Sequence, residues 1–254
     1  MYTKNIKKLI PSFVKKPVKD LCLYILFIID FKKFKEDTKN SRRFKIKWRN
    51  RYPRLFDKTP KTSFDHHYIY HPAWAARIVK EINPKFHVDI SSTLSFSSML
   101  SAFIPVHFYD YRPANILLSN LKSNKIDLMS LPFPNNSVES ISCMHTVEHI
   151  GLGRYGDPIN PNGDLLAIKE LKRVLAKNGN LLFVVPIGKD KVAFNAHRIY
   201  SYNQITDYFS DLILKEFSLI PDNGLDAGII INATEEQANK QNYGCGCFWF
   251  KKNI

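Results

Sequence analysis

The chain has 254 residues, of which 44% are hydrophobic, and a formal net charge of +14 at pH 7. The excess charge is local, because residues 1–62 hold 19 basic against 5 acidic side chains, whereas residues 63–254 hold 18 of each. A nucleic-acid-binding protein normally carries its basic face on the folded domain, so this distribution argues against nucleic acid as a partner. The 4 cysteines form no C-x-x-C pair, which argues against a disulfide framework and a zinc knuckle.

We therefore predict a basic leader over residues 1–62 and one sizeable domain over residues 63–254. The leader contains an apolar run at residues 21–29 with lysines on both sides. A membrane span needs about 20 apolar residues, and this run is about half as long, so we do not expect it to cross a bilayer. Two interpretations stay open: a helix on the anionic surface of the inner membrane, and a helix packed on the domain. We expect a cytoplasmic protein, peripheral to the inner membrane in the first case.

Beyond residue 84, short apolar runs alternate with stretches of helical periodicity. We predict strands at residues 86–90, 106–110, 125–128, 137–144, 181–186, 214–220 and 245–251. We predict helices at residues 94–103, 163–176 and 201–212. Alternating strands and helices, with continuously apolar strands, indicate an α/β fold in which helices cover both faces of a mostly parallel sheet.

Polar side chains stand where the predicted strands end, and ligands of parallel sheets bind beyond these carboxyl ends. Asp89 and Ser91 mark the first strand end and Asp110 the second. Asp127 marks the third, and His145 follows the fourth. Carboxylates accept paired hydrogen bonds from a diol, so acids at neighbouring strand ends suit a ligand that carries a ribose. We expect the three acids to converge on one crevice.

The loop after the fourth predicted strand, HTVEHIGLGRYGDP at residues 145–158, matches two short motifs. The H-x-x-E-H motif of zinc peptidases requires both histidines on one helix, but a strand precedes His145. The G-x-G-x-x-G motif of dinucleotide loops should follow the first strand and begin a helix, but here it follows the fourth strand. We therefore expect no metal site, and we interpret the glycines as a turn that presents Arg154 to an acceptor.

His197 and Arg198 lie just beyond the fifth predicted strand. A histidine is a suitable general base for a hydroxyl, because its ordinary pKa is near neutrality. Arg198 and Arg154 can hold a phosphate or carboxylate through forked hydrogen bonds. Each residue alone is equally consistent with helix capping or surface pairing, but their convergence at one end of the sheet favours a function.

Two segments resemble the central part of class I S-adenosylmethionine-dependent methyltransferases. They are LPFPNNSVESISCMHTVEH at residues 131–149 and LKRVLAKNGNLLFVVP at residues 171–186. More narrowly, VHFYDYRP (106–113), HIGLGRYGDP (149–158) and FNAHRIY (194–200) resemble domain of unknown function family 268, which occurs among bacterial surface-polysaccharide genes. The resemblance covers residues 86–250 and implies a Rossmann-like methyltransferase domain.

The resemblance also implies S-adenosylmethionine as the cofactor and assigns residues to its parts. The cofactor-binding positions are Asp89 and Ser91 beside the methionine, Asp110 at the ribose with Tyr111 next to it, Asp127 and Leu128 at the adenine, and His145 facing the methyl group or the acceptor. The catalytic set is His145, His197, Arg198 and Arg154.

The implied reaction is methyl transfer from a sulfonium to an oxygen of a surface-glycan precursor, either a sugar hydroxyl or a phosphoryl oxygen. Catalysis of such a transfer depends mainly on positioning, and only a hydroxyl acceptor needs a base. The alternative is a non-catalytic binding or scaffold subunit of a glycan assembly complex. This alternative follows from the first loop, because residues 89–96 contain no glycine and serine adopts positive φ less easily.

Overall fold

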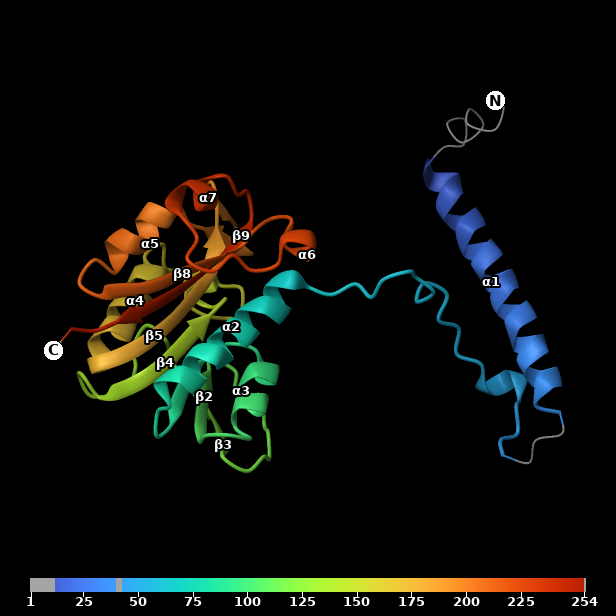
Figure 1. The fold of residues 1–254 in the computed structure, drawn as a ribbon, viewed down its shortest axis with the longest axis horizontal. Coiled ribbons are helices and arrows are strands. Elements are labelled where there is room, and N and C mark those ends of the chain that lie inside the picture. Colours follow the sequence, from blue (N-terminus) through green and yellow to red (C-terminus); the bar gives the residue numbers. More distant parts are fainter. Residues whose placement is uncertain (1–11, 40–42, 254) are drawn as a thin grey trace. The chain divides into compact units, whose positions relative to one another are not determined.

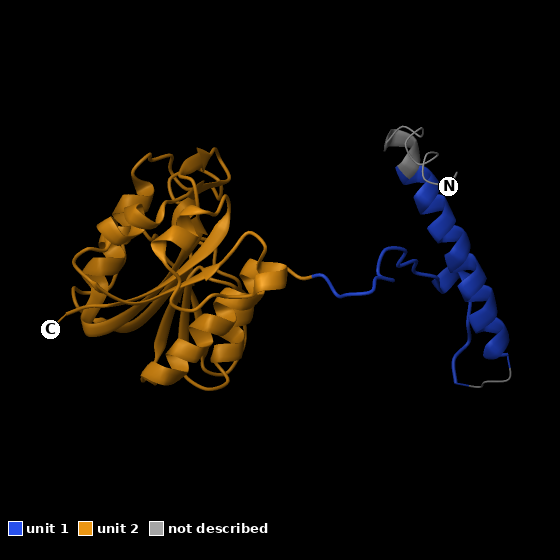
Figure 2. Ribbon diagram, turned by 45° about the horizontal axis from the view of Figure 1, so that its top comes forward, with its two compact units in different colours: residues 1–63 blue, residues 64–254 orange. Residues whose placement is uncertain are grey.

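The computed structural model of the chain describes residues 12–39 and 43–253. It divides the chain into two compact units, Met1–Ser63 and Phe64–Ile254, which are distinguished by colour in Figure 2.

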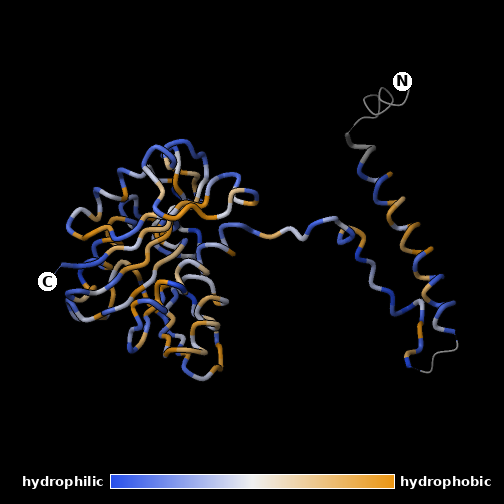
Figure 3. Tube along the Cα trace, viewed as in Figure 1, coloured by the Kyte–Doolittle hydropathy of each residue, from blue (hydrophilic) through white to orange (hydrophobic). Residues whose placement is uncertain are grey.

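Unit 1 is built around one long helix, α1 (Ser12–Asp37), which confirms the expected N-terminal helix. One side of α1 carries Phe27 and Phe31. A short 3-10 turn, η2 (Trp48–Asn50), follows in the chain, and Trp48 packs on both phenylalanines. The ring centroids of Trp48 and Phe31 are 4.9 Å apart. Apolar and polar residues alternate along α1 in Figure 3. Within residues 12–39 and 43–253, the apolar stretches of every helix fall short of what a membrane crossing requires.

Unit 2 contains a seven-stranded sheet in the order β3-β2-β1-β4-β5-β9-β8 (Figure 1). Its strands are β1 (His87–Ile90), β2 (Val106–Asp110), β3 (Leu121–Lys125), β4 (Val138–Met144), β5 (Leu175–Ile187), β8 (Ile213–Ile220) and β9 (Gly244–Lys251). Only β9 pairs antiparallel, with β5 on one side and β8 on the other. The prediction of a Rossmann-like, mostly parallel sheet is confirmed.

Helices cover both faces of this sheet, as the alternation along β5 shows. Phe183 belongs to one buried cluster with residues of α4 (Gly163–Val174) and α5 (Tyr202–Tyr208), whereas Leu182 belongs to a second cluster with residues of α2 (His66–Ile82) and α3 (Leu94–Leu100). Figure 1 shows the two pairs of helices on opposite sides of the strands. The remaining elements are η3 (Val147–His149), the hairpin of β6 (Lys191–Ala193) and β7 (His197–Ile199), α6 (Gly224–Ala227) and α7 (Glu235–Asn239).

One prediction about local structure was wrong, and one helix was missed. The third strand is β3, not residues 125–128, because an edge strand paired only with β2 is largely exposed and lacks an apolar run. The apolar Ile126 and Leu128 lie after it in the core. The helix α2 was not predicted at all, since its histidines and its internal Pro72 obscure the helical pattern. The Asp65 side chain caps its first turn by accepting from the Tyr68 backbone N–H.

Candidate functional site

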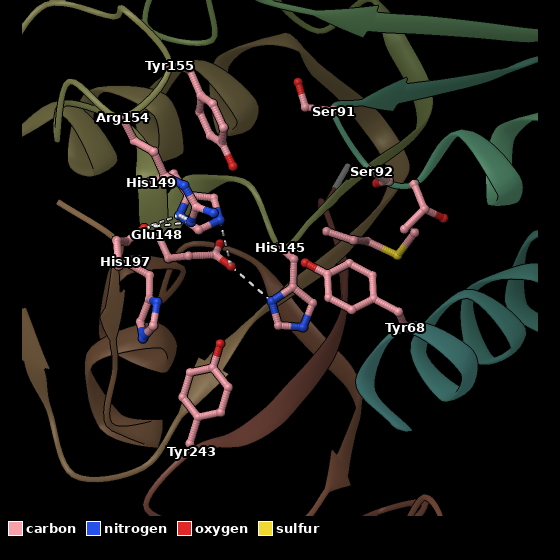
Figure 4. Close-up of a pocket in the computed structure, with 13 residues that line it drawn as sticks. Tyr68, Ser91, Ser92, His145, Glu148, His149, Arg154, Tyr155, His197 and Tyr243 are labelled. Carbon is pink, nitrogen blue, oxygen red and sulfur yellow. Dashed lines mark hydrogen bonds and ion pairs between the residues drawn. The ribbon is translucent and has the colours of Figure 1, made fainter. Parts of the chain in front are cut away.

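A polar cavity of about 430 Å³ lies beyond the ends of β1 and β4 (Figure 4). Its volume is in the range of small-molecule sites. It is lined by Tyr68, Ser91, Ser92, Thr93, Met144, His145, Glu148, His149, Arg154, Tyr155, Ala196, His197 and Tyr243. The structure thus brings together four predicted positions from distant parts of the chain, namely Ser91, His145, Arg154 and His197.

The turns that leave β1 and β4 have the same backbone feature. Ser91 and His145 both have φ of 53°, the left-handed region in which glycine is favoured. The Ser91 N–H donates to the Tyr109 carbonyl at 2.7 Å and its hydroxyl donates to the same oxygen at 3.2 Å. A serine therefore forms a turn that favours glycine, at a cost of about 1–3 kcal/mol that these two hydrogen bonds offset.

Asp89 does not reach the cavity, which contradicts its predicted contact with the cofactor. Its side chain is fully buried inside the sheet layer and accepts hydrogen bonds from the Ser97 and Ser142 hydroxyls. Burial raises the pKa of this carboxyl to about 6. Because Asp89 lies within β1, the alternation of the strand turns its side chain towards α3 instead of the strand end.

The raised pKa of Asp89 predicts a specific dependence of stability on pH. The folded protein binds this proton up to about pH 6, whereas the unfolded chain releases it near 3.8, so the contribution of Asp89 to stability should fall as pH rises from about 4 to about 6. We expect Asp89→Asn to remove most of this fall, because the amide does not ionise. Urea denaturation of the wild type and the variant between pH 4 and 7 measures the free energy of unfolding of each. The same pH dependence of this free energy in both proteins would contradict the prediction.

Three further predicted cofactor positions border a second, much smaller hollow of about 30 Å³. Tyr111, Asp127 and Leu128 line it together with Ser91 and Tyr155, which also line the larger cavity. A volume of 30 Å³ corresponds to one water molecule. The half of the crevice predicted for adenine is therefore nearly closed, with Tyr155 between the two spaces.

Asp110 and Asp127 lie at neighbouring strand ends, as predicted, and each is engaged locally. The Asp110 carboxylate accepts from the Arg112 N–H at 2.7 Å, and the Asp127 carboxylate accepts from the Met129 N–H at 2.9 Å. Each carboxylate has further lone pairs that can accept hydrogen bonds from a ligand.

The glycines after β4 form a turn, in agreement with our interpretation. Gly151, Gly153 and Gly156 have φ between 70° and 84°. Asp157 closes the turn, because its carboxylate accepts from the N–H groups of Gly151 and Tyr155 at 2.8 and 3.1 Å. The turn places Arg154 on the cavity wall, where its guanidinium donates to the Ala196 carbonyl at 2.9 Å.

Arg198 is not a cavity residue, so its predicted role in holding an anion was wrong. Its side chain is buried, and its guanidinium donates to the carbonyls of Ile150 at 2.7 Å and Pro161 at 3.2 Å. Its Nε lies 3.5 Å from the Asp164 carboxylate. Successive residues of a strand point to opposite sides, so β7 presents His197 to the cavity and Arg198 to the interior.

His197 faces the cavity, as predicted, with its ring 5.1 Å from that of Tyr243. Partial burial lowers the pKa of His197 below its ordinary value of 6.5. The side chain is therefore neutral near pH 7, the state in which a ring nitrogen can accept a proton.

His145 forms part of the cavity floor, and its two ring nitrogens have different surroundings. Its Nδ1 lies 2.9 Å from the Glu148 carboxylate, and its Nε2 is buried without a hydrogen-bond partner. The His149 Nε2 lies 3.8 Å from the same carboxylate. The H-x-x-E-H motif thus gathers two histidines around Glu148, and His145 is not in a helix, so the peptidase-type zinc arrangement does not form.

The cavity includes residues that our sequence analysis missed. Tyr68 lies in the unpredicted helix α2, and Tyr243 precedes the last strand. Figure 4 shows His145 between Tyr68 on one side and His197 with Tyr243 on the other. The run of histidine and tyrosine at residues 66–71 shows a concentration of polar aromatic residues, but it indicated neither the helix nor its place at the cavity.

The chain was compared with known families and structures. A family model described as "Caenorhabditis protein of unknown function, DUF268" matches residues 126–221. No curated protein sequence matches the chain. The solved N-methyltransferase NodS from Bradyrhizobium japonicum, in complex with S-adenosylhomocysteine, is similar with a TM-score of 0.50 and 13% identity, over 72% of this chain and 86% of that chain. A putative methyltransferase from Bacillus halodurans has a TM-score of 0.49 and 14% identity, over 72% and 99% of the two chains.

Unit 2 has the class I methyltransferase fold. The likeness to NodS confirms the fold that the resemblance implied. The family match includes two of the three segments that carried the narrower resemblance, residues 149–158 and 194–200. In this class I fold, the cavity lies where ligands of parallel sheets bind, at the carboxyl ends of the strands.

Proposed function

We propose that unit 2 is an S-adenosylmethionine-dependent methyltransferase that acts on an oxygen of a surface-glycan precursor. The observation that carries the proposal is the polar cavity at the strand ends of a class I fold, where Ser91 forms a left-handed turn and Asp110 and Asp127 stand at the next two strand ends. The turn lets the backbone come close to a ligand, and the two acids offer acceptors for a ribose and an adenine amine.

The residues fit the cofactor in the following way. Ser91 would border the methionine, Asp110 would accept from the ribose hydroxyls beside Tyr111, and Asp127 with Leu128 would hold the adenine if the Tyr155 side chain left the crevice. The bound cofactor supplies an electrophilic methyl group. His197 accepts the proton of a sugar hydroxyl, and Arg154 orients an anionic group of the acceptor.

Calorimetric titration with S-adenosylmethionine and S-adenosylhomocysteine tests this function. We expect Asp110→Ala to weaken binding about 10-fold or more, because hydrogen bonds to a charged group contribute about 1.5–3 kcal/mol. Asp207→Ala, which removes an exposed acid from α5, serves as the matched control and should bind as the wild type does. Equal affinities of the Asp110 variant and the wild type would contradict the assigned ribose site.

The second candidate is a non-catalytic binding or scaffold subunit of a glycan assembly complex. The narrowness of the adenine half, about 30 Å³ beside Tyr155, favours it. The same titration discriminates the two functions, because absence of heat and of a thermal shift with both ligands would favour the scaffold.

We further propose that α1 docks on an anionic membrane surface, which would place the protein at the cytoplasmic side of the inner membrane. Val18, Leu21, Ile25 and Ile29 lie on one face of α1 by their spacing, and about half or more of each side chain is exposed. In a flotation gradient at low salt, we expect the protein to float with anionic vesicles. The double variant Leu21→Gln and Ile25→Gln should no longer float with them. Equal flotation with neutral vesicles, or none with either kind, would contradict this proposal.

A further inference from the structure

Three imidazole rings gather beneath the cavity floor. His67 and His71 lie one turn apart on α2, and their ring centroids are 5.6 and 5.1 Å from that of His145. The Nε2 atoms of all three are buried and lack a hydrogen-bond partner. An unpartnered buried polar atom costs about 1–3 kcal/mol, so three of them in one place require an explanation.

A cysteine completes this cluster from the opposite side. The sulfur of Cys245, the second residue of β9, one ring nitrogen of His67 and one of His145 all lie within 4.8 Å of one another. A central point is therefore within about 2.8 Å of each atom. Zinc bonds to nitrogen and sulfur are about 2.0–2.3 Å long, so side-chain shifts of under about 1 Å bring these atoms into bonding distance.

The ring nitrogens of His145 and His71 that face away from the cluster have the carboxylate and carbonyl partners that are common for metal-binding histidines. The His145 Nδ1 faces the Glu148 carboxylate at 2.9 Å, and the His71 Nδ1 faces the His67 carbonyl at 2.7 Å. Such partners fix the proton on Nδ1 and leave Nε2 as a lone-pair donor. The second oxygen of Glu148 is buried without a partner. A divalent ion beside a cysteine thiolate and this carboxylate would leave the buried group without net charge.

We propose that His67, His145 and Cys245 bind a divalent transition metal of the zinc class, with the fourth position open to His71 or water. Nitrogen and thiolate donors of this kind select zinc-class ions over magnesium or calcium. The site joins α2 to the turn after β4 and to β9. Its ligand His145 also lines the cavity, but the proposed methyl transfer assigns no step to this residue. Our sequence analysis expected no metal, because a strand precedes His145 in the H-x-x-E-H motif. The ligands at residues 67, 145 and 245 form no local motif that could have indicated this site.

The structure also offers an entry path. A second hollow of about 380 Å³ reaches His67 and is lined by Asp65, His66, Tyr68, Asp222 and Tyr243 as well. Its two carboxylates give the mouth a negative charge, which attracts a cation.

Metal analysis of the purified full chain, freed of any affinity tag, is the first test. We expect about one zinc per chain after dialysis, and removal by a chelator should lower the melting temperature until zinc is restored. Cobalt titration of the metal-free protein should give the near-ultraviolet absorption of a cobalt–thiolate bond. Cys245→Ser should abolish this absorption and His67→Gln should weaken it, whereas Cys143→Ser, which changes another buried cysteine, should retain it.

Several results would overturn the proposal: wild-type protein without stoichiometric zinc or cobalt binding, cobalt binding without thiolate absorption, or unchanged absorption in Cys245→Ser. If the variants fail to fold, X-ray absorption on the zinc-loaded wild type decides. One sulfur with at least two nitrogen neighbours supports the site, and a shell without sulfur contradicts it. None of these measurements depends on methyl transfer, so the metal site and the proposed function can fail separately.

Discussion

Replacement of Arg198 by alanine is expected to lower the free energy of unfolding by about 3–5 kcal/mol. The variant leaves the Asp164 carboxylate, which is 5% exposed, without its cation. It also removes the donor for the Ile150 carbonyl, in the loop that forms one side of the cavity. The Tyr200 hydroxyl, which donates to Asp164 at 3.0 Å, remains as a partner but carries no charge.

Urea denaturation measures this loss, and Arg154→Ala provides the matched control. Arg154 is an exposed arginine of the cavity wall, so its removal should change stability by less than about 1 kcal/mol. The double variant Arg198→Ala and Asp164→Asn should lose less stability than the sum of the losses in the two single variants. The reason is that the Asp164 charge is removed together with its partner Arg198. An Arg198→Ala protein that is as stable as the wild type but inactive would restore the anion-binding role that the structure contradicts.

Replacement of His197 by asparagine is expected to lower kcat about 10²-fold if the acceptor is a sugar hydroxyl. The cofactor affinity should not change, because the proposed contact of His197 is with the acceptor and not with the cofactor. Since burial lowers the pKa of His197, wild-type kcat should fall only as the pH drops below its ordinary value of 6.5, and the variant should lack this fall. Initial rates at saturating cofactor between pH 5 and 8 test both points.

The expected effects of the His197 and Arg154 variants on kcat depend on which acceptor the enzyme uses. For an anionic phosphoryl oxygen, which needs no base, Arg154→Ala should have the large effect and His197→Asn a small one. His107→Asn is the matched control, because His107 lies on β2 away from the cavity and burial lowers its pKa too. Unchanged rates in both the His197 and the Arg154 variants would contradict the proposed acceptor site.

The sequence by itself determined the architecture of unit 2. Apolar runs such as residues 181–186 specify buried strands locally, and the alternation of strands with helical periodicity leaves few arrangements other than a covered parallel sheet. Turn chemistry was also local, since glycines at 151, 153 and 156 adopt the positive φ that the turn after β4 requires. For the same reason, Ser91 and His145 could be placed at strand ends before the structure was known.

Only the tertiary structure decided which side chains face the cavity and which neighbours they meet. Asp89 and Arg198 were predicted at the right places in the chain, but strand alternation and the helix or loop that covers each strand direct them into the interior. His67 and Cys245 gave no local signal, because 178 positions separate them in the sequence and only the packing of α2 across the end of β9 brings them together. Periodicity reports burial along one element, whereas a site depends on distances between elements, which the folded chain alone defines.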